Sequence, residues 1–229
     1  MATRFHQANN KEYPAWVNSR WLAAGEAIAA SLLVFGHDVL RLVPNPLPLL
    51  FVMAMISFRV RTGRWTGMGL GRPKSWGRTI VYAVAAAAAQ QALGMFVVDP
   101  LLQPFLHYSA QANPLATHRT FAMLRWFAII WTYAAFGEEI VYRGYVLNRV
   151  ADIGNQSRTA LVFGLLWASI VFGLAHWYQG PAGVVSAAVS GMVFGATYLL
   201  TAKNLWVTVL AHGLSDSLAL LATAFGLAG

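Results

Sequence analysis

The chain of 229 residues is strongly apolar: 58% of its residues are hydrophobic, only 10% are charged, and its mean hydropathy is +0.54. A soluble domain carries about a quarter charged residues, so this composition excludes an ordinary soluble protein and favours a membrane protein. The absence of cysteine excludes structural disulfides, zinc–thiolate sites and thiol nucleophiles. The formal net charge is +8, but the basic residues cluster between apolar stretches, so we expect no nucleic-acid partner.

Seven apolar stretches follow one another along the chain, and they cover residues 21–40, 43–58, 79–98, 119–150, 159–178, 181–201 and 204–227. Most are long enough to cross a hydrocarbon core of roughly 30 Å as a helix. The second is short and contains Pro44, Pro46 and Pro48, which indicates a tilted or re-entrant segment. We therefore predict an all-α fold, a polytopic membrane bundle of about seven helices. Residues 1–20 are predicted to form a tail and residues 21–229 a single membrane-embedded domain.

Basic residues indicate the orientation of this bundle. Six of them lie in residues 59–78, between the second and third stretches, whereas residues 99–117 contain no Lys or Arg. Because cytoplasmic loops carry an excess of Lys and Arg, residues 59–78 are predicted to be cytoplasmic and residues 99–117 to lie outside. The N-terminal tail is then cytoplasmic as well. Arg41, Arg119 and Arg125 fall toward the outer side and run against this rule, but they are outnumbered.

Several side chains inside the stretches are predicted to hold helices together. Gln90 and Gln91 are typical of hydrogen bonds between membrane helices, and we assign the same structural role to Glu26. A ridge of small residues recurs every four positions and favours close helix packing: Gly183, Ala187, Gly191 and Gly195.

The most informative charged motif is Glu138-Glu139-xxx-Arg143, which directly follows a long apolar run. An ionisable residue near the middle of a bilayer is costly and is a functional candidate by default. Residues four apart share one face of a helix, so Glu139 can pair with Arg143, while Glu138 lies about 100° away. Glu138 is then free to act as a general base. An ordinary ion pair at a helix end is the alternative interpretation.

Two of the six histidines, His176 and His212, lie inside the last spans. At about 1.5 Å per residue, Glu138, His176, His212 and Asp216 lie roughly 12 to 27 Å from their cytoplasmic turns. These depths define one layer roughly 15 Å thick, as shared chemistry requires. His212 and Asp216 are also four residues apart, so they share a face and can form a hydrogen bond.

Three motifs, Glu138-Glu139-xxx-Arg143, Phe172-xxx-His176 and His212-xxx-Asp216, together resemble the signature of the CPBP family of intramembrane endopeptidases. That family includes CAAX-processing and bacteriocin-processing or self-immunity proteins. Residues 69–76 also look like the cytoplasmic stretch that precedes the core in bacterial members. The resemblance covers residues 65–227, with the core motifs in residues 119–227. It implies an integral protein of a bacterial inner membrane.

The resemblance also implies an intramembrane active-site cavity bounded by the motif residues. By carry-over, Glu138 activates a water, His176 helps to hold it, and His212 with Asp216 stabilises the oxyanion. Many members have asparagine at the last position, whereas an ionised Asp216 can only accept a hydrogen bond. Asp216 must then be protonated or must orient His212. The other motif residues are expected to be supporting residues: Glu139, Arg143 and Phe172.

Two mechanisms stay open. The expected one is a glutamate protease that needs no metal or other cofactor. The alternative is a zinc protease in which Glu138, His176 and His212 bind the metal, because two histidines and a carboxylate leave one position for a water. The zinc alternative lacks the H-E-x-x-H spacing and would use the proposed base as a ligand.

We expect hydrolysis of a membrane-associated peptide or protein near the cytoplasmic half of the bilayer, so the predicted partners are this substrate and the lipid bilayer. A non-proteolytic membrane scaffold or immunity factor of the same fold is the alternative from another functional class. A transporter is disfavoured because no inverted repeat is evident. The identity of the substrate, its prenylation and the oligomeric state do not follow from the sequence.

Overall fold

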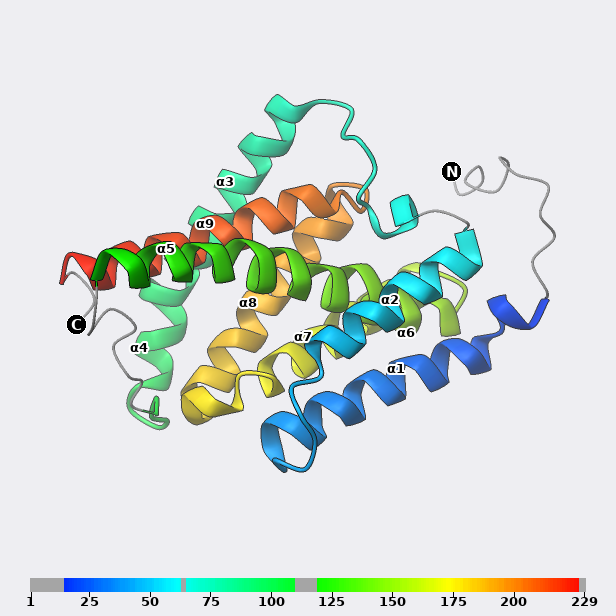
Figure 1. Ribbon diagram of the computed structural model, residues 1–229, viewed down its shortest axis with the longest axis horizontal. Helices are drawn as coiled ribbons and strands as arrows, with labels where there is room; N and C mark the ends of the chain where they lie inside the picture. The colour runs from blue at the N-terminus through cyan, green and yellow to red at the C-terminus, as the bar shows by residue number, and fades with distance from the viewer. Residues whose placement is uncertain (1–14, 63–64, 110–118, 227–229) are drawn as a thin grey trace.

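The computed structural model describes residues 15–62, 65–109 and 119–226, and within these residues the chain forms helices and turns but no strand. Residues 1–14 of the predicted tail lie outside this description. The α-helices are α1 Arg20–Val34, α2 Leu47–Thr62, α3 Trp76–Leu93, α4 Asp99–Leu102, α5 Arg119–Ile129, α6 Leu147–Ile153, α7 Arg158–Leu174, α8 Gly180–Leu200 and α9 Leu205–Ala224 (Figure 1). The π-helical segments are η2 Phe35–Val39, η4 Gly94–Val98, η5 Ile130–Glu138 and η6 Ile140–Val146, and the 3-10 turns are η1 Ala15–Asn18, η3 Trp65–Met68 and η7 Trp177–Gln179.

Several of these helices join end to end, so that the described residues form seven helical rods. α1 continues through η2 to Val39, and α3 continues through η4 and α4 to Leu102. The longest rod runs from Arg119 to Ile153 through α5, η5, η6 and α6. Each rod coincides with one predicted apolar stretch. The predicted all-α helical bundle is therefore confirmed.

The proline-rich stretch forms one short continuous helix, α2. α2 begins after Pro44 and Pro46, and Pro48 lies in its first turn. Proline is tolerated there because the first N–H groups of a helix have no partner within the helix. The whole helix, Leu47–Thr62, has 16 residues, a rise of about 24 Å.

The distribution of side chains is that of an integral membrane protein. Leu32, Ile56, Val81 and Phe163 are each more than half exposed on the outside of the bundle. Such a coat of large apolar side chains suits contact with lipid and not with water. Within the described residues, four helical segments are long and apolar enough to cross a membrane: Arg20–Val39, Trp76–Leu102, Trp177–Leu200 and Leu205–Ala224.

The contacts predicted to hold helices together are present. Gln90 donates to a serine hydroxyl of α8 over 3.0 Å, and Gln91 donates to a backbone carbonyl of α9 over 3.2 Å. Glu26 on α1 accepts from Arg61 on α2 over 3.0 Å. Gly191 lies so close to α7 that an added Cβ would come within 3.1 Å of its backbone. These three structural predictions are confirmed.

Because the rods alternate in direction, their connections gather at two ends of the bundle (Figure 1). One end is formed by the described connections at residues 65–75, 154–157 and 201–204, and the other by residues 40–46, 103–109 and 175–179. The first contains Arg72, Lys74 and Lys203, and we call it the basic end. We call the second the opposite end.

Candidate active site

The two adjacent glutamates lie where the longest rod departs from α-helical geometry. η5 ends at Glu138 and η6 begins at Ile140, so π-helical turns flank Glu139 on both sides. The sequence prediction assumed a regular α-helix here, and that assumption was wrong. π-helical turns are rare and occur frequently at functional sites.

Glu139 is fully buried, and its Oε1 atom contacts two partners. Arg143 donates to this oxygen from Nη1 over 2.8 Å, which confirms the predicted pair. His212 lies on the other side, with its Nδ1 atom 2.9 Å from the same oxygen. Since an ionised carboxylate only accepts hydrogen bonds, Nδ1 of His212 is the donor in this contact. The sequence prediction missed the contact because it joins residues 73 positions apart.

Phe172 packs where the three motifs meet. Its ring centroid lies 4.7 Å from that of His176 and 6.0 Å from that of His212. The guanidinium of Arg143 lies 4.5 Å from the same centroid, a favourable position over an aromatic face. Tyr142 adds an edge-on contact at 5.0 Å. One side chain thus holds both histidines and the arginine in place.

Glu138 and His176 line a cavity of about 240 Å³. In the part of the chain that the structure describes, the carboxylate of Glu138 makes no hydrogen bond and no ion pair, unlike that of Glu139. His176 donates from Nδ1 to the backbone carbonyl of Phe172 over 2.8 Å. A neutral imidazole that donates from Nδ1 keeps Nε2 as an acceptor. The cavity therefore combines a free carboxylate with an imidazole acceptor.

Asp216 lies beside His212, one helical turn farther along α9. Its Oδ2 atom is 3.4 Å from Nε2 of His212, which is long for a hydrogen bond. The side chain of Asp216 is 39% exposed and that of His212 only 7%. Both ring nitrogens of His212 thus face carboxylate oxygens, and a neutral ring can donate to only one of them. Neither residue lines the cavity of Glu138 and His176.

Sequence reasoning missed most of the cavity wall. The polar lining residues that it did not assign are His37, Asp38, Arg41, Asn45, Tyr133, Tyr142 and Tyr178. Four of them come from η2 and the connection that follows it. There Nδ1 of His37 lies 2.8 Å from a backbone carbonyl, and Asn45 donates to the hydroxyl of Tyr133. A cluster of polar residues at the end of the first apolar stretch was the available signal.

The cavity lies toward the opposite end of the bundle, because its walls include residues 37–47 and 175–178. The expectation that residues 59–78 are cytoplasmic therefore disagrees with the expectation that hydrolysis occurs near the cytoplasmic half of the bilayer. If the basic end is cytoplasmic, the cavity cannot lie in the cytoplasmic half of the bilayer. The predicted depths already pointed this way, since about 18 Å for Glu138 and about 27 Å for His176 exceed half of a core roughly 30 Å thick.

The described residues contain no group of three or more His, Cys, Asp or Glu side chains arranged to hold a metal ion. Glu138 and His176 share the cavity, whereas His212 contacts Glu139. The ligand set of the zinc alternative is therefore not gathered in this arrangement.

Residues 120–218 match the sequence profile of the Rce1-like family, described as type II CAAX prenyl endopeptidase. The matched segment contains all three motifs, from Glu138 to Asp216. The resemblance to the CPBP family is confirmed. The match supports an intramembrane protease, while no curated protein and no solved structure matches the chain.

The cavity extends beyond the part of the chain that matches this endopeptidase family. Glu138, His176 and the three lining tyrosines lie within residues 120–218. Residues 37–50, which supply the facing wall, lie outside the match. The wall contributed by the first two rods is therefore a part of the site for which the family match gives no role.

Proposed function

We propose that the chain is an intramembrane endopeptidase in which Glu138 is the general base. The observation that carries this proposal is the difference between the two adjacent carboxylates. Glu139 is occupied by Arg143 and His212, whereas Glu138 faces a cavity and has no partner among the described residues. A general base must be free to take a proton from water, and only Glu138 meets this condition.

In the proposed reaction Glu138 accepts a proton from a water molecule in the cavity as the water oxygen attacks the carbonyl carbon of the peptide bond. His176 orients the same water by accepting a hydrogen bond at Nε2, because Nδ1 donates to the carbonyl of Phe172. The tetrahedral intermediate collapses as the C–N bond breaks. The leaving nitrogen takes the proton back from Glu138. Proton transfer of this kind contributes about 10² to 10⁴-fold to a rate.

His212 is proposed to donate to the oxyanion from Nε2, which requires the substrate carbonyl to reach beyond the cavity lining toward α9, because His212 is not one of the lining residues. Glu139 accepts from Nδ1 of the same ring, so donation from Nε2 requires protons on both nitrogens. Asp216 lies on the Nε2 side and is proposed to help orient the ring, while Glu139 supplies the nearer negative charge. This proposal adds Glu139 to the expected role of Asp216 in orienting His212, since the shorter contact is made by Glu139.

The proposed substrate is a membrane-associated peptide or protein that enters the cavity from the opposite end. A prenylated C-terminus is one candidate, because the matched family is described as a CAAX prenyl endopeptidase. Because Lys and Arg are concentrated at the basic end, we place that end in the cytoplasm and the cavity toward the outer side of a bacterial inner membrane.

Cysteine labelling tests this orientation without background, because the chain contains no cysteine of its own. Gln103→Cys places an exposed thiol at the opposite end, and Arg158→Cys places one at the basic end. In intact cells a membrane-impermeant maleimide should label the first variant, and it should label the second only after lysis. The reverse pattern would put the cavity on the cytoplasmic side.

A comparison of membrane proteomes tests the protease itself. A deletion strain and a strain carrying Glu138→Ala should accumulate the same uncleaved precursors. If the protein is instead a scaffold or immunity factor that needs only the fold, Glu138→Ala should restore the function lost in the deletion strain. No uncleaved precursor should then accumulate.

Metal analysis of the purified protein separates the two mechanisms. The proposed glutamate mechanism predicts full activity after chelation and no stoichiometric zinc. Loss of activity on chelation with recovery on adding Zn²⁺ would favour a metal bound by Glu138, His176 and His212 in a rearranged site.

A further inference from the structure

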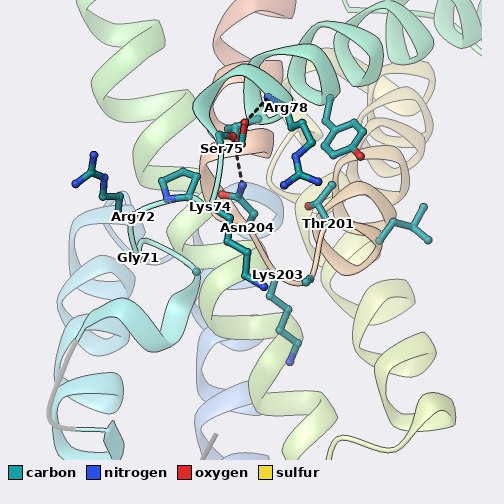
Figure 2. A pocket seen from close by; sticks show the side chains of 14 residues that line it. Gly71, Arg72, Lys74, Ser75, Arg78, Thr201, Lys203 and Asn204 are labelled. Carbon is teal, nitrogen blue, oxygen red and sulfur yellow. Dashed lines mark hydrogen bonds between the residues drawn. The ribbon is translucent and has the colours of Figure 1, made fainter. Parts of the chain in front are cut away.

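A second and larger cavity, of about 490 Å³, lies at the basic end (Figure 2). It opens between the start of α3 and the turn that joins α8 to α9. Its polar and charged lining includes Arg72, Lys74, Ser75, Arg78, Thr201 and Asn204. The proposed protease mechanism uses none of these residues.

The walls of this cavity are held in place by hydrogen bonds between the two segments. The backbone N–H of Leu205 donates to the carbonyl of Gly69 over 3.1 Å, and the indole of Trp206 donates to the carbonyl of Leu70 over 3.3 Å. Asn204 donates to the hydroxyl of Thr79 on α3 over 3.0 Å. The two segments that form the cavity are therefore fixed relative to each other by the fold.

The charge of the lining is entirely positive, since none of its described members is acidic. Lys74 and Arg78 are exposed, and within the described residues neither forms an ion pair with a carboxylate. In Figure 2 the guanidinium of Arg78 points toward Thr201, and Arg72 extends away from the other labelled residues. Two unpaired cations at one cavity form a site for an anionic group.

Lys203 also lines the cavity, but its ammonium group is already held elsewhere. It donates to Asn148 over 2.7 Å and to Gln156 over 2.6 Å. Its role is to anchor the turn that forms one wall. The binding charges are therefore Lys74 and Arg78.

The surroundings of the cavity suit a lipid. Tyr82 and Leu200 line it, and they are 49% and 86% exposed on the outer surface of α3 and α8. Trp76, which is 45% exposed, is the first residue of α3. Aromatic residues gather where a helix leaves the hydrocarbon core, and apolar surface below them can contact acyl chains. A phosphate bound by Lys74 and Arg78 would then lie at headgroup level.

We propose that this cavity binds the phosphate of an anionic phospholipid headgroup, held by Lys74 and Arg78 and flanked by Tyr82 and Leu200. Basic pockets between membrane helices recognise anionic headgroups in this way. A free phosphate would satisfy the same cations but would make no use of the exposed Tyr82 and Leu200. The proposal is independent of the catalytic role of Glu138.

Thermal unfolding of the purified protein tests the proposal by titration with short-chain phosphatidylglycerol, short-chain phosphatidylcholine or inorganic phosphate. The cavity variant combines Lys74→Gln with Arg78→Gln. The matched control combines Arg59→Gln with Arg158→Gln, which removes the same charge from exposed residues of the same end outside the cavity. Removal of two cations near an anionic lipid should weaken the apparent affinity for phosphatidylglycerol by at least about tenfold.

The expected result is a rise in unfolding temperature with phosphatidylglycerol that the control retains and the cavity variant loses. Equal losses in the two variants would mean a diffuse surface attraction and would overturn the proposal. An equal rise with inorganic phosphate would identify a free anion as the ligand and would overturn the lipid assignment. No response of the unmodified protein to phosphatidylglycerol would also refute it.

Discussion

The motif residues Glu139, Arg143 and His212 are buried and paired with one another, whereas at the basic end two cavity cations, Lys74 and Arg78, are exposed and have no carboxylate partner among the described residues. Arg143 is 2% exposed and is held by Glu139 and by the ring of Phe172. Lys74 and Arg78 line an open cavity. A buried charge loses the free energy of hydration and needs partners within the protein, but a charge at the membrane surface keeps its water.

This difference explains why one unpaired group at the buried site is informative. Among the motif charges, Glu138 alone faces a cavity without a hydrogen bond or ion pair in the described structure. Unpaired cations at the surface are common and carry meaning only when a cavity gathers them. The same observation, a missing partner, therefore points to catalysis at one end and to ligand binding at the other.

The largest effect is expected from Glu138→Gln. The amide keeps the shape of the side chain but cannot accept a proton from water, so turnover should fall by at least about 100-fold. The unfolding temperature and its rise with phosphatidylglycerol should stay unchanged, because the basic end is untouched. Both are measured on the same purified variant. Turnover equal to that of the unmodified protein would show that Glu138 is not the general base. The difference in pairing between Glu138 and Glu139 would then have no catalytic meaning.

Arg143→Ala should lower stability as well as activity. It leaves Glu139 buried without its guanidinium partner, which costs about 3 to 5 kcal/mol. Arg158→Ala is the matched control, since Arg158 is exposed at the basic end and its loss should change stability by less than about 0.5 kcal/mol. Chemical denaturation in detergent compares the two. Lost activity with unchanged stability in Arg143→Ala would place Arg143 in contact with the substrate instead.

Sequence separation decides which contacts of the site could be predicted. The pair of Glu139 and Arg143 is four residues apart, so helical periodicity was enough to predict it. The contact of Glu139 with His212 depends on how α9 packs against the π-helical segments, and periodicity carries no information about that packing. Apolar length likewise predicted the seven rods but not which connections form the cavity.

The end of the bundle at which the cavity lies was harder to predict than the motif residues that line it. Counting residues along each helix gave the depth of Glu138 and His176, but the expected cytoplasmic position did not follow from those depths. The structure places residues 37–47 against the cavity, and this wall identifies the end at which it lies. Such a wall comes from rods distant in sequence and could not be inferred from the motifs.

A smaller effect, and a test of whether hydrogen bonding is enough at this position, is expected from Asp216. Asp216→Asn should keep activity within about tenfold, because an amide can accept from Nε2 of His212 and can itself donate to an oxyanion. Asp216→Ala should lose about 100-fold, as removal of one stabilising group does. Both variants are assayed on one substrate. Equal and nearly complete losses would refute this role and would favour a proton-transfer or metal-binding role for Asp216.

The smallest effect on catalysis is expected from Gly69→Ala, which acts on the basic end alone. Gly69 has a φ of +94°, and an added Cβ would lie 2.0 Å from the carbonyl oxygen of Lys203. The segment must then move from the turn that forms the cavity wall, at about 1 to 3 kcal/mol of stability. The response to phosphatidylglycerol should weaken while turnover in detergent stays close to normal. Gly77→Ala is the control, because its Cβ would meet only Ser75 at 3.9 Å. A full lipid response in Gly69→Ala would show that the cavity wall is not needed for binding.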